Sequence, residues 1–388
     1  MASAENLVRQ RLTGLVPSEL LDDPEQAASR HAAAVWSCLT EPGDGVAGTL
    51  VAALGPRTAL SVALEDGTDS VQDPNVVAAR RRWLPRLGTV DDAFRGAQRA
   101  GVRLLTAEDD EWPNALDDLG PHAPRCLWVR GDLGTLSSRT PAVALVGARA
   151  ATGYGEHVAM EMAAELAGSG ITVVSGGAYG IDGMAHRAAI AAGGRTLAFL
   201  AGGVDRAYPA GHADLLARIA AGPGAVAAEV PCGTTPTKWR FLQRNRLIAA
   251  AAGATVVVEA GWRSGSLNTA GHAAALGRAL GAVPGPVTSA ASAGCHRLLR
   301  EYDARCVTGA DDVRELLGLT GAAVSGDDSF TGDRTRVLDA LSVRVGRSAE
   351  EIARRSGFAP DDAQALLGML ELDGSAHRTA DGWRRRPA

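Results

Sequence analysis

Apolar residues recur with two different spacings along this chain, and the change from one to the other divides it into segments. Up to about residue 100, apolar patches recur at helical spacing and are separated by turns such as residues 41–45. This pattern predicts an N-terminal helical domain over residues 1–100. The following extension contains two apolar runs that predict short strands, at Val102–Thr106 and Leu127–Gly131.

Between residues 140 and 318, short continuous apolar runs alternate with helical patterns. The predicted strands are Val143–Val146, Thr172–Ser175, Thr196–Leu200, Ala225–Val230 and Thr255–Glu259. The predicted helices lie at about 155–168, 182–192, 210–221, 238–251 and 265–279. Continuous apolar runs are typical of parallel strands that are covered on both faces. The fold class is therefore α/β, with a Rossmann-like, doubly wound, mostly parallel sheet, and the core with its leading extension spans residues 101–318.

The last part of the chain has the pattern of a small separate domain. Residues 319–332 are rich in Gly, Ala, Ser and Asp and predict a linker. In residues 333–388, Ser348 and Glu351 form a capping box, a second helix is expected at about 361–372, and a hairpin at 375–385. This order predicts a winged helix. Its second helix carries no Lys or Arg, so whether the domain contacts DNA or a protein stays open.

Composition limits the classes of function. Hydrophobic residues make up 46%, charged residues 21% and aromatic residues 4%, and the net charge is −5. This is a globular chain with few aromatic platforms and no overall charge signal for nucleic acid. The five cysteines are scattered, which predicts neither a disulfide framework nor a metal site. Without a signal peptide or a long apolar run, we expect a cytoplasmic protein with no membrane contact.

Glycine-rich turns follow four of the predicted strands. They include Gly147 with Arg149, then the turn with Gly176, Gly177 and Gly180, then residues 202–209, and then Ser264, Gly265 and Ser266. Because the carboxyl ends of parallel strands meet at one edge of a sheet, these turns are expected to lie together. Glycine backbones and helix N-termini favour anions, so the edge is predicted to bind phosphate groups.

The turns lack the sequence motifs that bind dinucleotides or nucleoside triphosphates in related folds. The first turn does not have the spacing of a dinucleotide-binding G-x-G-x-x-G, and no Walker lysine motif is present. Glu229 and Glu259 end predicted strands at the same edge, and Asp182 opens a helix that we expect it to cap. An enzyme that binds or cleaves nucleotides therefore remains an alternative.

The densest cationic segment opens the helix at 238–251. It contains Lys238, Arg240, Arg244 and Arg246 together with two aromatic residues, and Lys238 is the only lysine of the chain. Helical spacing places Arg240 and Arg244 on one face. Arginines beside aromatic rings suit a single nucleic-acid strand, whose phosphates and unpaired bases they can both contact.

These segments resemble motifs of the DNA-processing protein A (DprA/Smf) family, in the family's order, from about residue 101 to 310. The resemblance rests on 143–155, 175–186, 202–209, 243–249, 258–269 and 283–285. It implies a non-catalytic protein without cofactor that binds single-stranded DNA, forms a homodimer, and loads RecA recombinase during natural transformation. Carried over, the pocket residues are Arg149, Gly176, Gly177, Gly180, Lys238, Arg244, Asn245, Arg246, Ser264 and Ser266. His296 departs from the pattern, because the family usually has asparagine there.

Overall fold

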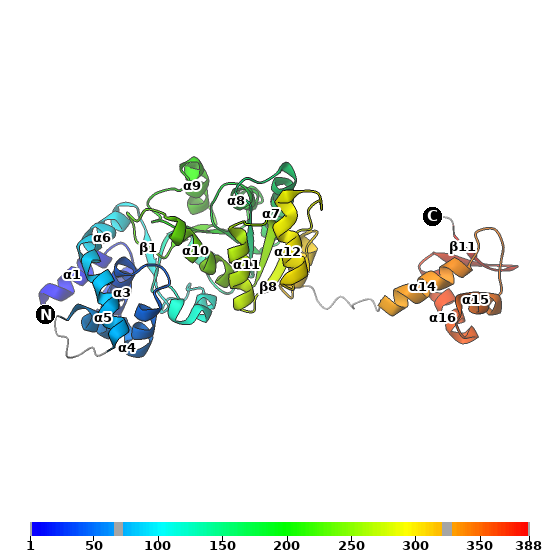
Figure 1. Cartoon of the computed structure of the whole chain (residues 1–388), viewed down its shortest axis with the longest axis horizontal. Coiled ribbons are helices and arrows are strands. Elements are labelled where there is room, and N and C mark those ends of the chain that lie inside the picture. Colours follow the sequence, from blue (N-terminus) through cyan, green and yellow to red (C-terminus); the bar gives the residue numbers. More distant parts are fainter. Residues whose placement is uncertain (1, 66–72, 320–327, 387–388) are drawn as a thin grey trace. The chain divides into compact units, whose positions relative to one another are not determined.

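The computed structural model describes residues 2–65, 73–319 and 328–386. The chain forms two compact units, one that extends to Leu319 and one that begins at Thr320. This division coincides with the start of the predicted linker. Figure 1 shows the helices and strands of both units.

The first part of the larger unit is a bundle of helices, as the apolar spacing predicts. The helices are α1 (Ala2–Leu12), α2 (Ser18–Leu21), α3 (Pro24–Leu39), α4 (Gly45–Leu64), α5 (Pro74–Trp83) and α6 (Val90–Arg99). Asp23, Asp44 and Asp73 cap the N-termini of α3, α4 and α5 by accepting hydrogen bonds from backbone amides. In the bundle core, the rings of Trp36 and Trp83 meet edge to face at 5.0 Å between centroids.

Among the described residues, nine strands form one sheet in the order β1-β2-β6-β5-β4-β3-β7-β8-β9. Their bounds are β1 (Arg103–Leu105), β2 (Leu127–Gly131), β3 (Ala142–Gly147), β4 (Thr172–Ser175), β5 (Thr196–Phe199), β6 (Ala225–Ala228), β7 (Ala254–Glu259), β8 (Ala279–Ala282) and β9 (Arg305–Cys306). The strands from β3 to β9 are parallel to one another, and β2 runs antiparallel to both of its neighbours, β1 and β6. The Rossmann-like fold class is confirmed. The strands β8 and β9 at the far edge were not predicted.

Helices cover both faces of the sheet (Figure 1). They are α7 (Gly153–Gly168), α8 (Ile181–Ala191), α9 (Ala213–Ala221), α10 (Lys238–Ala250), α11 (Ser266–Ala275), α12 (Ala293–Glu301) and α13 (Ala310–Leu316). Alternate residues of β3 point to opposite faces: Val143 and Leu145 pack with α7 and α8, whereas Ala144 and Val146 pack with α10 and α12. This double cover is the reason why β3 is a continuous apolar run.

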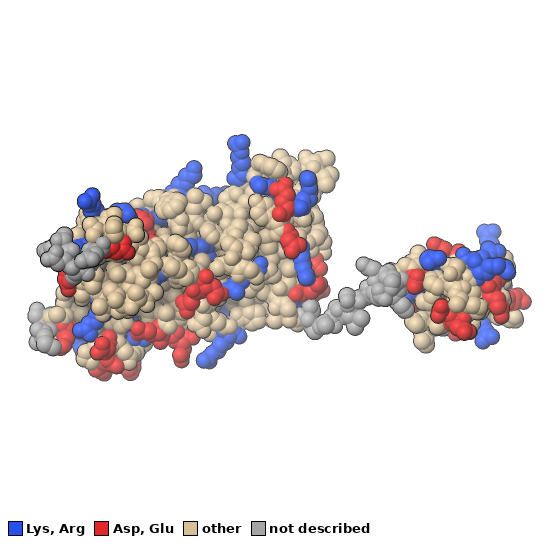
Figure 2. Space-filling model, turned by 60° about the horizontal axis from the view of Figure 1, so that its bottom comes forward, with Lys and Arg blue, Asp and Glu red and all other residues tan. Residues whose placement is uncertain are grey.

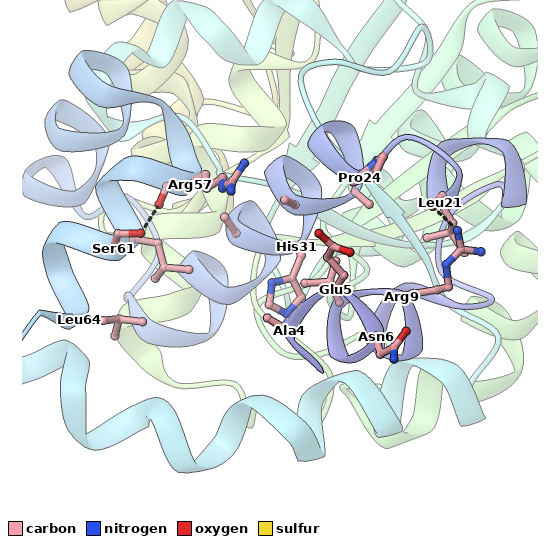
Figure 3. Close-up of a pocket in the computed structure, with 15 residues that line it drawn as sticks. Ala4, Glu5, Asn6, Arg9, Leu21, Pro24, His31, Arg57, Ser61 and Leu64 are labelled. Atoms are coloured by element: carbon pink, nitrogen blue, oxygen red, sulfur yellow. Dashed lines mark hydrogen bonds between the residues drawn. The ribbon is translucent and has the colours of Figure 1, made fainter. Parts of the chain in front are cut away.

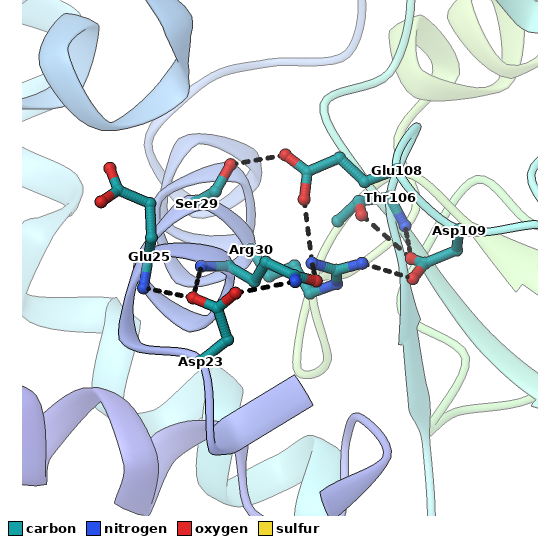
Figure 4. Close-up of polar contacts among 8 residues, drawn as sticks. Asp23, Glu25, Ser29, Arg30, Thr106, Glu108 and Asp109 are labelled. Atoms are coloured by element: carbon teal, nitrogen blue, oxygen red, sulfur yellow. Dashed lines mark hydrogen bonds and ion pairs between the residues drawn. The ribbon is translucent and has the colours of Figure 1, made fainter. Parts of the chain in front are cut away.

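The helical bundle and the sheet share one hydrophobic cluster, so the boundary predicted at residue 100 does not separate two independent bodies. Trp128 of β2 lies in this cluster and donates a hydrogen bond from its indole nitrogen to Ser37 of α3 at 3.1 Å. Arg30 of α3 is 3% exposed and donates to Glu108 and Asp109, each at 2.9 Å (Figure 4). These contacts fix the bundle against the sheet edge formed by β1 and β2.

The smaller unit has the order predicted for a winged helix. Its elements are α14 (Asp328–Ala340), α15 (Ala349–Ser356), α16 (Pro360–Leu372), β10 (Ala376–Thr379) and β11 (Gly382–Arg385). Ser348 caps α15 by accepting from the Glu351 amide at 3.2 Å, as expected. The predicted extent of the linker, 319–332, is wrong at its end. Helix α14 begins at Asp328, and Val337 and Leu341 hold it to the core that includes Trp383.

Candidate nucleic-acid interface

The strand order reverses between β3 and β7, and a cavity of about 510 Å³ opens at their carboxyl ends. The turns after β3 and β7 form its walls, and α10 forms its floor. The predicted site residues that line it are Gly147, Arg149, Arg244, Asn245, Ser264, Gly265 and Ser266. Ligands of doubly wound sheets bind at such a reversal, so this cavity is the candidate site.

Three exposed cations around this edge have no carboxylate partner. Arg149 and Arg263 line the cavity, and Lys238 begins α10 beside it. Within the described ranges, none of the three side chains makes a hydrogen bond or an ion pair, and the guanidinium of Arg149 lies over the ring of Phe241, 4.6 Å from its centroid. Sequence reasoning missed Arg263, and it counted Phe241 only as one of the two aromatic residues of the cationic segment.

The other cations of the segment 238–246 are already engaged within the protein. Arg240 donates to Glu41 of the helical bundle at 2.9 and 3.0 Å. Arg246, with a side chain 4% exposed, donates to both carboxylate oxygens of Glu229 at 2.7 and 2.8 Å. Neither lines the 510 Å³ cavity. Helical spacing alone could not reveal these partners, since they lie far away in sequence or on another element.

Arg244 is buried beneath the turn that follows β4. It is 5% exposed and donates to the carbonyl of Phe199 at 3.0 Å. Burial lowers the pKa of Arg244 to about 10, and nearby Asp182 opposes this shift. The turn passes so close to the guanidinium that a Cβ on Gly176 would lie 1.7 Å from its Nη1. A side chain at position 176 would therefore displace the Arg244 guanidinium.

Asp182 does not cap its own helix, contrary to our expectation. Its carboxylate accepts from the backbone amides of Gly176 and Ala178, at 3.2 and 3.4 Å, and so closes the turn after β4. Because both amides donate to Asp182, neither is free to bind a phosphate. Of the residues in this turn, Ala178 lines the cavity, whereas Gly176, Gly177 and Gly180 do not. At position 180, a Cβ would lie 2.2 Å from the carbonyl oxygen of Ala148, so Gly180 allows the turns after β3 and β4 to touch.

The two other carboxylates considered as catalytic groups also have structural partners. Glu259 is 2% exposed and accepts from the amide and the hydroxyl of Thr152, at 2.8 and 2.6 Å. Glu229 holds Arg246 and accepts from the Gly43 amide at 3.2 Å. Each stabilises a turn or a domain contact.

Polar groups on α10 and α11 complete the cavity wall. The Asn245 amide donates to Asn268 at 3.2 Å, which joins the two helices. The hydroxyls of Ser264 and Ser266 lie 2.7 Å apart at the cavity. Behind the turn after β8, the His296 ring bonds to the carbonyl of Gly285 at 2.9 Å.

Five exposed aromatic side chains follow five adjacent strands at the carboxyl edge. In the order β6, β5, β4, β3 and β7, they are Trp239, Tyr208, Tyr179, Tyr154 and Trp262. Their exposed fractions range from 42% to 58%. Aromatic residues are scarce in the chain, and these are gathered at one edge. We call these five residues the aromatic row; only the sheet topology brings them together.

The surface charge agrees with a local rather than a global anion site. On the face of the larger unit that Figure 2 shows, Lys and Arg are interspersed with Asp and Glu. With a net charge of −5, long-range attraction of a polyanion is weak, and binding depends on groups placed at the edge.

Another cavity, of about 370 Å³, lies within the helical bundle between α1, α3 and α4 (Figure 3). His31 points into it, and burial lowers the pKa of that ring to about 4, so the ring is neutral at pH 7.

Within the described ranges, no three His, Cys, Asp or Glu side chains are grouped as a metal site requires. Helix α4 is long and apolar enough to cross a membrane by length and composition alone; Ala47, Ala59 and Ala63 of this helix are buried in the bundle.

Fold and site together define a Rossmann-like α/β protein with a cationic and aromatic carboxyl edge and a C-terminal winged helix. Residues 103–318 match the family model of DNA recombination-mediator protein A, and residues 322–382 match that of the DprA winged helix domain. The chain belongs to the DprA/Smf family of DNA-processing proteins, as the motifs predict.

Relatives support this membership over most of the chain. A DNA processing protein DprA of Mycobacterium tuberculosis is 44% identical over 373 residues, which cover 91% of this chain and 94% of the relative. Protein Smf of Escherichia coli is 34% identical over 306 residues, 76% of this chain and 81% of the relative. The X-ray structure of DprA from Streptococcus pneumoniae matches with a TM-score of 0.61 at 29% identity, and the match covers 74% of this chain and 97% of that one.

Proposed function

We propose that this protein binds single-stranded DNA, without sequence preference, along the carboxyl edge of its sheet. The observation that carries the proposal is the aromatic row together with the unpaired cations Arg149, Lys238 and Arg263. Exposed rings can stack with any base, and each stacked base contributes about 1–3 kcal/mol. Cations without protein partners can contact phosphates without first breaking an ion pair.

A single strand fits this arrangement better than a duplex does. In a duplex the bases are already stacked and paired, so the row of rings would have no base face to contact. The cavity at the β3–β7 reversal, about 510 Å³, has room for one unstacked base beside Phe241. The phosphates on either side of that base would then lie near Arg149 and Arg263.

Within this proposal, the predicted site residues divide into two groups. Arg149, Lys238, Ser264, Gly265, Ser266 and Gly147 contact or border the strand. The buried set Arg244, Asn245 and Arg246, with Arg240 and the glycines at 176, 177 and 180, shapes the edge that the strand contacts. The four side chains of the second group, Arg240, Arg244, Asn245 and Arg246, already have partners within the protein.

We further propose that the protein acts without catalysis in the cytoplasm, as a homodimer that protects incoming strands and delivers them to RecA. The matched family of recombination mediators and the engagement of Asp182, Glu229 and Glu259 in structural contacts support this role. For any of these three carboxylates to act as the base of a nucleotide-cleaving enzyme, it would have to leave its structural partner. Incubation with mono- and dinucleotides followed by chromatography tests this point, and a product would refute the non-catalytic role.

Site-directed variants test the DNA proposal. We expect Arg149→Ala and Lys238→Ala each to weaken binding of a labelled oligonucleotide about 10-fold and to reduce the slope of log affinity against log salt by about 0.7. Arg139→Ala, which removes an exposed charge before β3 at the opposite edge, is the matched control. Equal affinity of the wild type and the two edge variants would refute the site.

A further inference from the structure

A second cavity at the carboxyl edge, of about 540 Å³, lies between the helical bundle and the core. The bundle contributes residues of α3, α6 and the turn between α5 and α6, and the core contributes the loops after β5 and β6. The cavity adjoins the aromatic row along the chain: Arg206, which lines it, is two residues from Tyr208, and Arg240 lies between Trp239 and Phe241.

Four arginines line this cavity, and two of them have at most one distant carboxylate partner among the described residues. They are Arg86, Arg99, Arg206 and Arg240. Arg99, at the end of α6, is exposed and makes no hydrogen bond or ion pair within the described ranges. Arg206 has a side chain 71% exposed, and its one ion pair is a 3.8 Å contact with the neighbouring Asp205.

The two carboxylates that line the cavity, Asp92 and Asp205, each have a nearer partner than the outer arginines. Asp205 accepts from the Gly233 amide at 2.9 Å. Asp92 pairs at 2.7 Å with Arg95, which does not line the cavity. The cations therefore exceed the carboxylates that could neutralise them.

A carboxylate already occupies the inner end of this arginine cluster. Glu41 bonds both Arg86 and Arg240. Burial by itself would raise the pKa of Glu41, but the hydrogen bonds from these two arginines lower it below its usual range, so the group stays ionised. The inner arginines thus hold an anion supplied by the protein, and the outer pair, Arg99 and Arg206, faces the same cavity without one.

We propose that this cavity is a second phosphate-binding site, which takes the phosphodiester groups of a DNA strand that leaves the aromatic row past Tyr208 and Trp239. The helical bundle then becomes part of the DNA interface through Arg99. This inference rests on the proposed function. If it is correct, the DNA-binding site extends beyond the sheet edge. Short oligonucleotides should then contact only the edge, whereas long ones should contact both the edge and this cavity.

The edge itself sets the lengths of the probes. From β6 to β7 the row spans five adjacent strands, or about 19 Å at ~4.8 Å per strand spacing. A strand of about 5 nucleotides is matched to the edge, and one of about 20 nucleotides extends beyond it. Oligothymidines of these two lengths, labelled with a fluorophore, are the probes for anisotropy titrations of the full-length protein.

The test variant is Arg99→Ala/Arg206→Ala, and the control is Arg139→Ala/Arg218→Ala. Both remove two exposed arginines, and the control pair lies at the amino edge, before β3 and near the end of α9. For the long strand we expect the test variant to lose at least about 10-fold in affinity and about 1.4 in salt slope, 0.7 per phosphate contact. For the short strand, both variants should bind like the wild type.

The outcomes separate the two proposals. If the wild type binds neither strand at low salt, the proposed function itself fails. If the wild type binds and the test variant matches it on the long strand, the second site is refuted while the edge site stands. Equal losses on both strands, or an equal loss in the control, would also overturn it. Because both test residues are exposed, the melting temperature should not change, and a thermal scan checks this.

Discussion

Replacing Arg246 by alanine should destabilise the protein much more than it weakens DNA binding. Arg246 is buried on α10 and donates to both oxygens of Glu229 through one nitrogen, Nη2. Its Nε and Nη1 have no hydrogen-bond partner within the described ranges. The pair lies where α10 meets the turn at Gly43, whose amide also bonds Glu229.

The magnitude follows from what the substitution leaves behind. Removing one partner of a buried ion pair costs about 3–5 kcal/mol, because the other charge stays buried without compensation. Glu229 keeps its bond from the Gly43 amide, so we expect the lower end of this range, about 3 kcal/mol. The larger unit extends to Leu319, and at about 2.1 cal/mol/K per residue its unfolding entropy is about 0.67 kcal/mol/K, so the melting temperature should fall by about 4–5 °C.

Thermal unfolding followed by circular dichroism measures this change. Lys238→Ala is the matched control, since its exposed side chain has no partner among the residues that the structure describes. Below its transition, Arg246→Ala should bind a single strand within about twofold of the wild type. In Arg246→Ala/Glu229→Ala, part of the lost stability should return, because the buried carboxylate is removed. A melting temperature equal to that of the wild type, or normal stability with lost DNA binding, would refute the structural role of Arg246.

Other perturbations test other parts of the structure. Gly176→Ala should displace the Arg244 guanidinium and lower the melting temperature, whereas Gly153→Ala, where a Cβ meets nothing within 4 Å, should not; equal melting would contradict the packing argument. Burial lowers the pKa of His186 to about 3. Below pH 6.5 the unfolded state therefore binds a proton that the folded state excludes, and the free energy of unfolding decreases as the pH is lowered. At pH 5 this amounts to about 2 kcal/mol, and His186→Gln should reduce the fall between pH 7 and pH 5; an unchanged pH profile would count against it. Truncation after Leu319, the last residue of the larger unit, should leave single-strand affinity within about twofold; a larger loss would assign DNA contacts to the winged helix.

Much of the fold could be predicted from local pattern. The strands from β3 to β7 agree with their apolar runs to within two residues at either end. Strand β8 was missed because its four residues, Ala279–Ala282, contain a glycine and follow a helix whose predicted end ran into them. In fact α11 ends at Ala275. Alanine-rich sequence carries little information about where a helix stops and a buried strand begins.

The candidate site was less predictable, because its chemistry depends on partners that are distant in sequence. The density of arginines in α10 indicated an anion site, but two of them pair with Glu41 and Glu229. The sequence around residue 240 does not indicate that these two glutamates are the partners of its arginines. The aromatic row is likewise invisible along the chain, since its members are separated by tens of residues and meet only when the sheet is formed.

Comparison of a labelled single strand with its matching duplex, at low and moderate salt, tests the central claim most directly. Fluorescence anisotropy should show clearly tighter binding of the single strand, with an affinity that falls linearly on a log–log plot against salt. Stacking on the aromatic row predicts that part of this affinity persists at moderate salt. Equal binding of strand and duplex, or no binding of either, would contradict the assignment of this edge to single-stranded DNA.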